Sequence, residues 1–264
     1  MSREITNMNF RTVTKVFLTL FFLSTSVIAQ TAGGSSKPRF KAVAFDYFVI
    51  FDPRSVISDV EKEFPGKGIE FTRAWQSKQF EYAFLYSITN RYKDFFQITG
   101  DALEHTAEAM KLTIPAEVRT RLLDSYLKLK PWPDTVVTLK KLRAAGVRII
   151  TVSNFSRKML RANADHAGIT GLFDVLLSTE TNQSFKPDPQ AYKLGLKILG
   201  LRKDEIAFAA FGGWDVFGAK NFGYPTFWVN RFDLPAERLG AAADGTSQDL
   251  EGFLRFVLGK ETER

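Results

Sequence analysis

The sequence contains no cysteine and only two histidines, His105 and His166, among its 264 residues. The absence of cysteine excludes disulfides, thiolate catalysis and cysteine-ligated zinc sites. With two histidines, a histidine-rich metal centre or a Ser-His triad is not expected. Both histidines fall in stretches with helical spacing, so we interpret them as surface or hydrogen-bonded helix residues. Any chemistry must therefore come from other side chains.

The chain also lacks a concentrated run of basic residues, although its formal net charge is +7 and its pI is near 9.5. A nucleic-acid partner is therefore not expected. The positive net charge predicts only a slight preference for anionic ligands. Hydrophobic residues make up 45% of the chain, and phenylalanine occurs 25 times. This content suits one large domain, or a core domain with a cap, containing a thick apolar core or an aromatic pocket.

Residues 1–29 have the form of a secretory signal peptide. Basic residues precede an apolar run from Val16 to Leu23, and the small residues Val27 and Ala29 fit a cleavage site before Gln30. The run is too short and too interrupted by Ser and Thr to be a good membrane span, and an uncleaved N-terminal membrane anchor is the alternative. Residues 30–38 are expected to form a flexible linker. We therefore expect an exported protein, periplasmic or secreted.

The remaining sequence predicts an α/β fold with an inserted helical segment. Residues 42–45 form a short apolar run typical of a buried strand. Helical spacing and strand patterns then alternate from residue 131 onward, whereas the stretch between them has helical spacing only. The expected strands span 147–152, 175–178, 206–210 and 226–230, and the expected helices span 55–64, 72–89, 94–112, 116–129, 135–145, 157–167, 190–199, 216–222 and 248–258. This order predicts a doubly wound, Rossmann-like parallel sheet in a core of residues 39–52 and 131–264, with residues 53–130 as a helical cap domain.

Polar residues follow several of these strands. Asp46 ends the first strand, Ser153-Asn154 follow the next, Lys186 lies in a later loop and Asp215 follows residues 206–210. Open parallel sheets bind ligands at the carboxyl ends of their strands. Each residue also has a plain alternative: Asp46 could cap a loop or helix, the Ser-Asn pair and Asp215 could cap helices, and Lys186 could be solvated.

The order of these residues resembles the haloacid dehalogenase (HAD) superfamily, and within it the type II (S)-2-haloacid dehalogenases. The resemblance extends from about Arg39 to Arg231. It rests on Phe45-Asp46, Phe51-Asp52-Pro53-Arg54-Ser55-Val56, Lys78-Gln79-Phe80-Glu81-Tyr82, Arg91-Tyr92-Lys93-Asp94-Phe95, Ser153-Asn154, Lys186-Pro187-Asp188, Tyr192, Trp214-Asp215, Gly218-Ala219-Lys220, Phe222-Gly223-Tyr224-Pro225-Thr226 and Trp228-Val229-Asn230-Arg231.

The resemblance implies a hydrolase acting on 2-haloacids without a cofactor or metal, and it suggests a homodimer. It implies that Asp46 is the nucleophile that displaces halide, and that water then hydrolyses the aspartyl ester. Lys186 would pair with Asp46, Ser153 would hold the substrate carboxylate, and Asp215 would orient the lysine and the hydrolytic water. The residues expected to contact substrate are Tyr47, Phe48, Gln76, Phe80, Phe95, Asn154, Tyr192 and Trp214. For Phe80 and Phe95 a purely structural role in the core is the alternative.

Two positions separate this chain from the phosphatases of the same superfamily. Those enzymes need a general acid two residues after the nucleophile and a magnesium-binding acid four residues before the second aspartate. Here these positions hold Phe48 and Phe211. Phenylalanine offers no oxygen to Mg²⁺, so a magnesium phosphatase is not expected.

The chain also departs from the dehalogenase pattern around the leaving group. The segment after Asp46 is one residue shorter and lacks the family's Gly-Thr, Gln76 replaces a cap arginine, and Gly212 replaces an asparagine that receives halide. A hydrogen bond to a charged group contributes ~1.5–3 kcal/mol, so losing two would slow the reaction by roughly two to four decades. We therefore expect slow or altered dehalogenation. A catalytically impaired binding or envelope protein, or a hydrolase of another activated ester or phosphate, are the alternatives.

Overall fold

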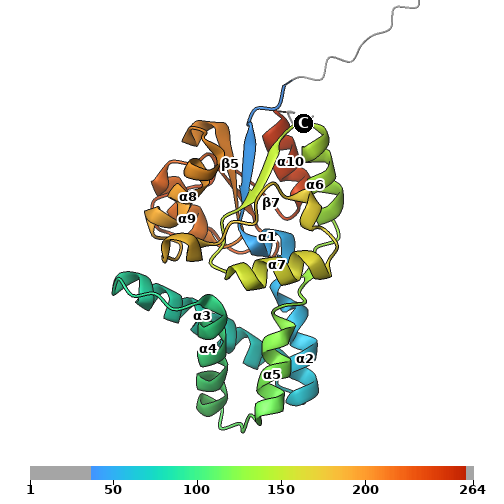
Figure 1. Ribbon diagram of the computed structural model, residues 1–264, viewed down its shortest axis with the longest axis vertical. Coiled ribbons are helices and arrows are strands. Elements are labelled where there is room, and N and C mark those ends of the chain that lie inside the picture. The colour runs from blue at the N-terminus through green and yellow to red at the C-terminus, as the bar shows by residue number, and fades with distance from the viewer. Residues whose placement is uncertain (1–36, 260–264) are drawn as a thin grey trace, which may run out of the picture. The chain divides into compact units, whose positions relative to one another are not determined.

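A five-stranded parallel sheet forms the centre of the computed structural model, which describes residues 37–259 (Figure 1). The expected signal peptide lies outside the described residues. The strand order is β4-β1-β5-β6-β7, and every pairing is parallel. The strands are β1 (Ala42–Phe45), β4 (Arg148–Thr151), β5 (Ile206–Ala210), β6 (Thr226–Val229) and β7 (Gly245–Ser247).

Helices cover both faces of this sheet, because alternate residues of each strand point to opposite faces. In β1, Val43 and Phe45 join a hydrophobic cluster with residues of α6 (Thr135–Ala144), α7 (Arg157–His166) and α10 (Leu250–Leu258). Ala42 and Ala44 join a second cluster with residues of α8 (Pro189–Leu199) and α9 (Gly213–Phe222). Figure 1 shows α8 and α9 on one side of the strands and α6 and α10 on the other. The predicted doubly wound fold is confirmed.

The chain between β1 and α6 is almost entirely helical. It contains α1 (Tyr47–Ile50), a 3₁₀ turn (Pro53–Val56), α2 (Ile57–Glu63), α3 (Gly68–Ile88), α4 (Phe95–Ala109) and α5 (Ala116–Ser125). Where the chain enters and leaves this block, β2 (Phe51–Asp52) pairs antiparallel with β3 (Lys130–Pro131). Within residues 37–259, no helix combines the length and apolar character needed to cross a membrane.

The structure differs from the sequence-based prediction at a few elements. The expected strand 175–178 makes only two isolated bridges to the β4 segment. The reason is Thr151, whose hydroxyl accepts the N–H of Leu177 at 2.7 Å and so takes the place of a backbone partner. The sequence pattern also missed α1, β2, β3 and β7, and α3 begins four residues earlier than expected. Three further 3₁₀ turns span Thr170–Leu172, Thr179–Asn182 and Lys203–Glu205.

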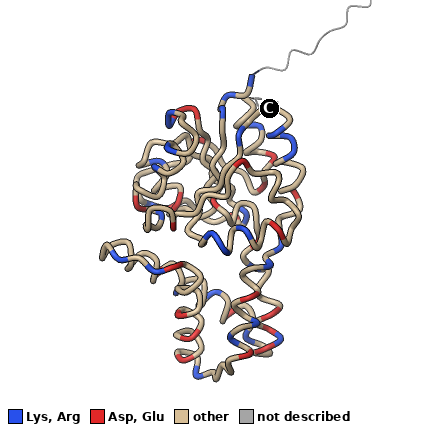
Figure 2. Tube along the Cα trace, in the orientation of Figure 1, with Lys and Arg blue, Asp and Glu red and all other residues tan. Residues whose placement is uncertain are grey.

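Charged residues are distributed over both the sheet-bearing part and the helical block (Figure 2). Basic and acidic residues are interspersed over the described chain, and several pair with each other, as Arg121 does with Glu63 at 2.7 Å. His105 on α4 and His166 at the end of α7 are both exposed, as predicted. The charged side chains that set this protein apart are therefore the few that are buried.

Candidate active site

Four polar side chains meet at the carboxyl edge of the parallel sheet. Asp46 follows β1 directly, Ser153 follows β4, and Asp215 lies in the first turn of α9, just after β5. Lys186 comes from the loop that precedes α8. All four are buried, with between 0 and 8% of the residue surface exposed. Strand ends place chemistry at this edge in open α/β sheets, as the sequence predicted.

The Lys186 ammonium lies between the two carboxylates. Its Nζ is 2.5 Å from Oδ2 of Asp46 and 2.6 Å from Oδ2 of Asp215. Burial lowers the pKa of Lys186, but the charges and hydrogen bonds of Asp215 and Asp46 outweigh it, so its pKa lies above the usual value. Lys186 is therefore a permanent cation shared by two acids, and the solvated-lysine alternative is wrong.

Asp215 is held from its other side by Tyr192. The Tyr192 hydroxyl donates to Oδ1 of Asp215 at 2.6 Å. Burial raises the pKa of Asp215 to about 6, although Lys186 and Tyr192 both act to lower it. Gly218 on α9 makes this contact possible, because a Cβ there would lie 2.3 Å from the Tyr192 hydroxyl oxygen. Glycine at position 218 therefore leaves the space in which the Tyr192 hydroxyl reaches Asp215.

The backbone of Lys186 is fixed by the side chain of Asn154. The Lys186 N–H donates to Oδ1 of Asn154 at 2.7 Å, and Nδ2 of Asn154 donates to the Lys186 carbonyl at 3.2 Å. Both ends of one amide are therefore used to hold one residue of the loop. Asn154 was predicted to contact substrate; it lines the cavity, and its Oδ1 and one N–H position Lys186 while the second N–H of Nδ2 takes no part in these two hydrogen bonds.

Asp46 begins the short helix α1 as well as facing Lys186. Its Oδ1 accepts the N–H of Phe48 at 2.8 Å, so the capping alternative is correct for one oxygen while Oδ2 faces the ammonium. The Oγ of Ser153 accepts the N–H of Phe155 at 3.1 Å, which leaves its O–H hydrogen for another acceptor. The shortened segment after Asp46 therefore still directs the carboxylate into the site.

A small cavity of about 10 Å³, room for about one water molecule, opens beside these groups. The side chains around it come from both the sheet edge and the helical block: Asp46, Tyr47, Phe48, Phe80, Phe95, Ser153, Asn154, Phe155 and Trp214. Ring contacts join the two sources, with centroids 5.4 Å apart for Phe80 and Trp214 and 5.5 Å apart for Phe95 and Phe155. The cavity therefore has one charged end and aromatic walls.

Two of the predicted substrate contacts, Tyr192 and Gln76, lie outside the cavity lining, and a third, Tyr47, lines the cavity with its hydroxyl already bonded. Tyr192 is fully buried behind Asp215 and does not line the cavity. Gln76 also lies outside the cavity lining, and its Nε2 donates to the carbonyl of Pro53 at 2.9 Å. Tyr47 lines the cavity, but its hydroxyl donates to the carbonyl of Leu160 at 2.7 Å. Sequence position alone could not give these side-chain directions.

Phe155 is a cavity residue that the sequence reasoning missed. Its ring centroid lies 5.2 Å from that of Phe48 and 5.6 Å from that of Tyr47, and all three rings line the cavity. The signal was available, because Phe155 follows Ser153-Asn154 in the same strand-end loop. In the described part of the chain, no cluster of three or more acidic or histidine side chains is arranged to hold a metal ion.

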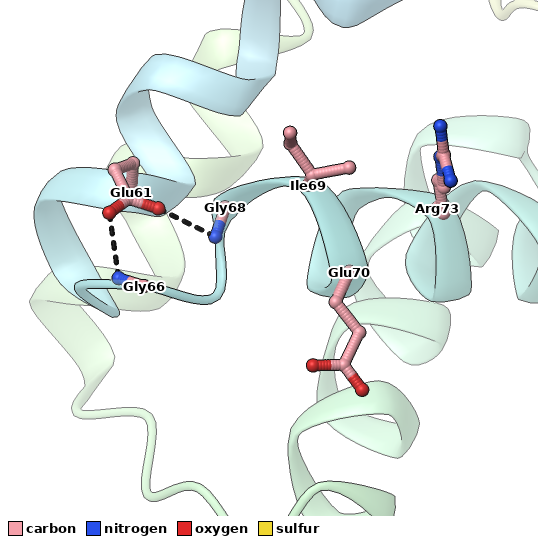
Figure 3. A pocket seen from close by; sticks show the side chains of 6 residues that line it. All are labelled: Glu61, Gly66, Gly68, Ile69, Glu70 and Arg73. Carbon is pink, nitrogen blue, oxygen red and sulfur yellow. Dashed lines mark hydrogen bonds between the residues drawn. The ribbon is translucent and has the colours of Figure 1, made fainter.

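A larger hollow of about 430 Å³ lies at the turn between α2 and α3 (Figure 3). Three charged residues, Glu61, Glu70 and Arg73, line it, and the two oxygens of Glu61 accept the N–H groups of Gly66 at 2.7 Å and Gly68 at 2.8 Å. These hydrogen bonds hold the pKa of Glu61 below its usual value. Glu61 therefore stabilises the turn, and the hollow lacks the converging polar groups of the sheet edge.

Comparison with known proteins identifies the family of this chain. The family model described as a haloacid dehalogenase-like hydrolase matches residues 6–223. The chain is 39% identical to the (S)-2-haloacid dehalogenase of Pseudomonas sp. (strain YL) over 205 residues, which cover 77% of this chain and 88% of that protein. It is 35% identical to the haloacetate dehalogenase H-2 of Moraxella sp. (strain B) over 220 residues, covering 83% of this chain and 98% of that protein.

A solved structure is similar over the same length. The L-2-haloacid dehalogenase from Xanthobacter autotrophicus with chloropropionic acid covalently bound matches with a TM-score of 0.79 at 31% identity. The match covers 84% of this chain and 100% of that chain. In sequence and in fold, the chain belongs to the haloacid dehalogenase-like hydrolase family and groups with its (S)-2-haloacid dehalogenases.

Proposed function

We propose that this protein hydrolyses (S)-2-haloalkanoic acids, with Asp46 as the nucleophile. One observation carries the proposal: the Lys186 ammonium lies 2.5 Å from Asp46 and 2.6 Å from Asp215, completely buried, beside an aromatic-walled cavity. The names of the similar proteins, which act on 2-haloacids and haloacetate, support the same substrate class. The ammonium supplies the positive charge of the site, since Phe48 and Phe211 offer no oxygen ligands for a metal.

The reaction follows in two steps. Oδ2 of Asp46 attacks C2 of the substrate, and the carbon–halide bond breaks with its electron pair leaving on the halide. Water then attacks the carboxyl carbon of the aspartyl ester and the acyl–oxygen bond breaks. The 2-hydroxy acid leaves with one proton of the water, the other proton passes to solvent, and Asp46 keeps the water oxygen. Ser153 holds the substrate carboxylate through its O–H group, and Asp215 keeps Lys186 in place. The solved relative with covalently bound chloropropionic acid supports an intermediate of this kind.

We also propose that the rate is low or that the substrate range is altered. Gln76 occupies the position where the family has an arginine. Its amide donates to the Pro53 carbonyl, and Gln76 does not line the cavity. Gly212 offers no side chain at all. Two lost charge-assisted contacts correspond to about two to four decades in rate.

The direct test is halide release from (S)-2-chloropropionate and from its (R) enantiomer. We expect release from the (S) form only, abolished in Asp46→Asn and retained in Asp52→Asn. Asp52 is the matched control, because it ends strand β2 and caps a turn, but its carboxylate binds Arg54 outside the cavity. A single turnover in ¹⁸O water should place the label in Asp46 first.

Equal release by wild type and Asp46→Asn would refute the nucleophile. No release by wild type, together with hydrolysis of activated esters or phosphates, would favour the alternative hydrolase. No activity on any of these substrates would favour a binding protein that retains the fold.

A further inference from the structure

The short helix α1 begins directly after the nucleophile and cannot hold its own shape. It spans Tyr47–Ile50, and Asp46 is its N-cap. All four residues of α1 are buried, with at most 6% of their surface exposed. A single helical turn is unstable on its own, because most of its carbonyl groups have no partner within it. Buried carbonyl groups need hydrogen-bond donors, so the rest of the fold must supply them to this turn.

Residues far away in the sequence donate to these carbonyl groups. Nε1 of Trp132 donates to the carbonyl of Phe48 at 2.9 Å, and Nη2 of Arg231 donates to that of Val49 at 3.3 Å. The backbone N–H of Trp132 donates to the carbonyl of Ile50 at 3.0 Å. Trp132 therefore holds α1 twice, once with its side chain and once with its main chain.

The segment after Asp46 has no side chain of its own that holds the carboxylate. Between Asp46 and Asp52 the only polar side chain is that of Tyr47, and its hydroxyl donates to the carbonyl of Leu160 at 2.7 Å. The segment also lacks the family's Gly-Thr. Its contact to Oδ1 of Asp46 is the backbone N–H of Phe48, at 2.8 Å. The direction of the carboxylate therefore depends on where that backbone lies.

Phe48 connects Trp132 to the nucleophile. Its N–H donates to Oδ1 of Asp46, while its carbonyl accepts the indole N–H of Trp132. The main chain of Phe48 is thus held on both sides, and the position of its N–H fixes the rotation of the carboxylate. With Oδ1 held in this way, Oδ2 faces Nζ of Lys186 at 2.5 Å. A displacement of Trp132 would therefore turn the attacking oxygen away from its position.

Trp132 is itself fixed in place. Only 9% of its surface is exposed, and the guanidinium carbon of Arg231 lies 4.8 Å from its ring centroid. Two hydrogen bonds, at 2.6 and 2.8 Å, anchor that guanidinium to Asp134. Trp132 follows β3 directly, where the chain returns from the helical block. Its indole therefore connects the turn after the nucleophile to the end of the helical block and to the chain after β6.

We propose that Trp132 is a positioning residue for the nucleophile and that it acts through the backbone of Phe48. The inference rests on the proposed function and adds to it the part of the fold that directs Asp46. Displacement at carbon requires the attacking oxygen in line with the bond that breaks, and a misplacement of about 1 Å can cost about a hundredfold in rate. Trp132 does not line the cavity, so it should affect the rate of the reaction and not the binding of substrate.

The test uses Trp132→Phe, which keeps a ring beside Arg231 and removes the indole N–H. The measurement is kcat and KM for halide release from (S)-2-chloropropionate. We expect kcat to fall by about tenfold to a hundredfold with KM nearly constant, because the carboxylate is misdirected while the cavity wall keeps its residues. An unchanged kcat, or a loss confined to KM, would overturn the inference.

Trp75→Phe is the matched control. Trp75 is also buried, and its Nε1 donates to the carbonyl of Thr99 at 2.8 Å, within the helical block and outside the cavity lining. This variant should lower the melting temperature as Trp132→Phe does, because each leaves a carbonyl group without its indole donor. Its kcat should stay near that of wild type. An equal loss of kcat in the two variants would trace the loss to stability and would rule out the positioning role.

A measurement without turnover separates this inference from the proposed function. Hydrogen exchange of the Phe48 amide, followed by NMR, reports whether its hydrogen bond to Asp46 is held. Relative to the amides of β5, which report unfolding of the whole core, the Phe48 amide should exchange at least about tenfold faster in Trp132→Phe than in wild type. In Trp75→Phe this ratio should not change.

The two measurements can fail independently. If wild type released no halide but the Phe48 amide still exchanged faster in Trp132→Phe, the proposed function would fail and the positioning of Asp46 by Trp132 would stand. An unchanged exchange ratio in Trp132→Phe would remove the positioning role, whatever the activity. Arg231→Lys is a second variant in case Trp132→Phe does not fold, since lysine loses the flat contact with Trp132 and the paired hydrogen bonds to Asp134. It should raise the same exchange ratio, and an unchanged ratio there would contradict the inference as well.

Discussion

Replacing Tyr192 with phenylalanine removes one hydroxyl from behind the buried acid Asp215. That hydroxyl donates to Oδ1 of Asp215 at 2.6 Å, and the Tyr192 ring packs between Phe208 and Phe222, with centroids 5.4 and 5.8 Å away. Phenylalanine keeps these ring contacts. The perturbation is therefore close to the deletion of a single hydrogen bond to a carboxylate.

The sign of the effect follows from the pKa of Asp215. Burial raises this pKa to about 6, and the Tyr192 hydrogen bond acts in the opposite direction by favouring the charged form. Activity requires the charged form, which helps to hold Lys186, so wild-type kcat/KM should fall below about pH 6. Deleting a hydrogen bond worth ~1.5–3 kcal/mol raises the pKa by about one to two units at ~1.36 kcal/mol per unit. The acid limb should then lie at about pH 7 to 8.

The assay is the pH dependence of kcat/KM for halide release between pH 5 and pH 9. Tyr224→Phe is the matched control, since its hydroxyl donates at 2.9 Å to the Tyr192 carbonyl and not to Asp215. Its acid limb should stay near that of wild type. An acid limb of Tyr192→Phe that coincides with wild type, or that moves to lower pH, would refute the reasoning.

Three further substitutions test the surroundings of the buried cation. Lys186→Met should lower the free energy of unfolding, measured by urea denaturation, by about 3–5 kcal/mol, because it leaves two acids buried without their cation. Lys193 is exposed, so Lys193→Met should change this free energy little. Equal losses in the two variants would contradict the prediction. Asn154→Ala should lower the free energy of unfolding by about 1–3 kcal/mol, and it should lower kcat with KM nearly constant, because Asn154 holds the Lys186 backbone. A raised KM at unchanged kcat would instead indicate a substrate contact. Gly218→Ala, whose Cβ would lie 2.3 Å from the Tyr192 hydroxyl, should move the acid limb upward as Tyr192→Phe does, and an unmoved limb in the folded variant would contradict it.

The sheet could be predicted because its strands carry a physical signal in their own residues. Strands buried on both faces read as short apolar runs, and β1 and β5 occupy the residues expected for them, 42–45 and 206–210. The expected strand at 175–178 failed because a hydroxyl on a neighbouring segment, that of Thr151, took one of its N–H groups. β7 was missed because Gly245–Ser247 is short and not apolar. Strand pairing depends on neighbours that are distant in sequence.

The positions of the site residues could be predicted, whereas the directions of their side chains could not. Asp46, Lys186 and Asp215 are brought together because parallel strands end at one edge of the sheet. Nothing in the local pattern fixed Tyr192 behind Asp215, or Gln76 on the Pro53 carbonyl. In a strand, successive side chains point to opposite faces of the sheet, but no such rule gives the direction of a side chain in a loop or at a helix end.

The sequence alone determined four of the five strands of the sheet, the inserted helices and the set of acids and lysine that follow the strands, because apolar periodicity and chain order encode them directly. The tertiary structure decided which groups engage each other. It committed Asn154 to the backbone of Lys186, and it placed the indole N–H of Trp132 on the carbonyl of Phe48. Such commitments depend on hydrogen bonds and contacts between segments far apart in the chain, and these form only when the whole core is packed.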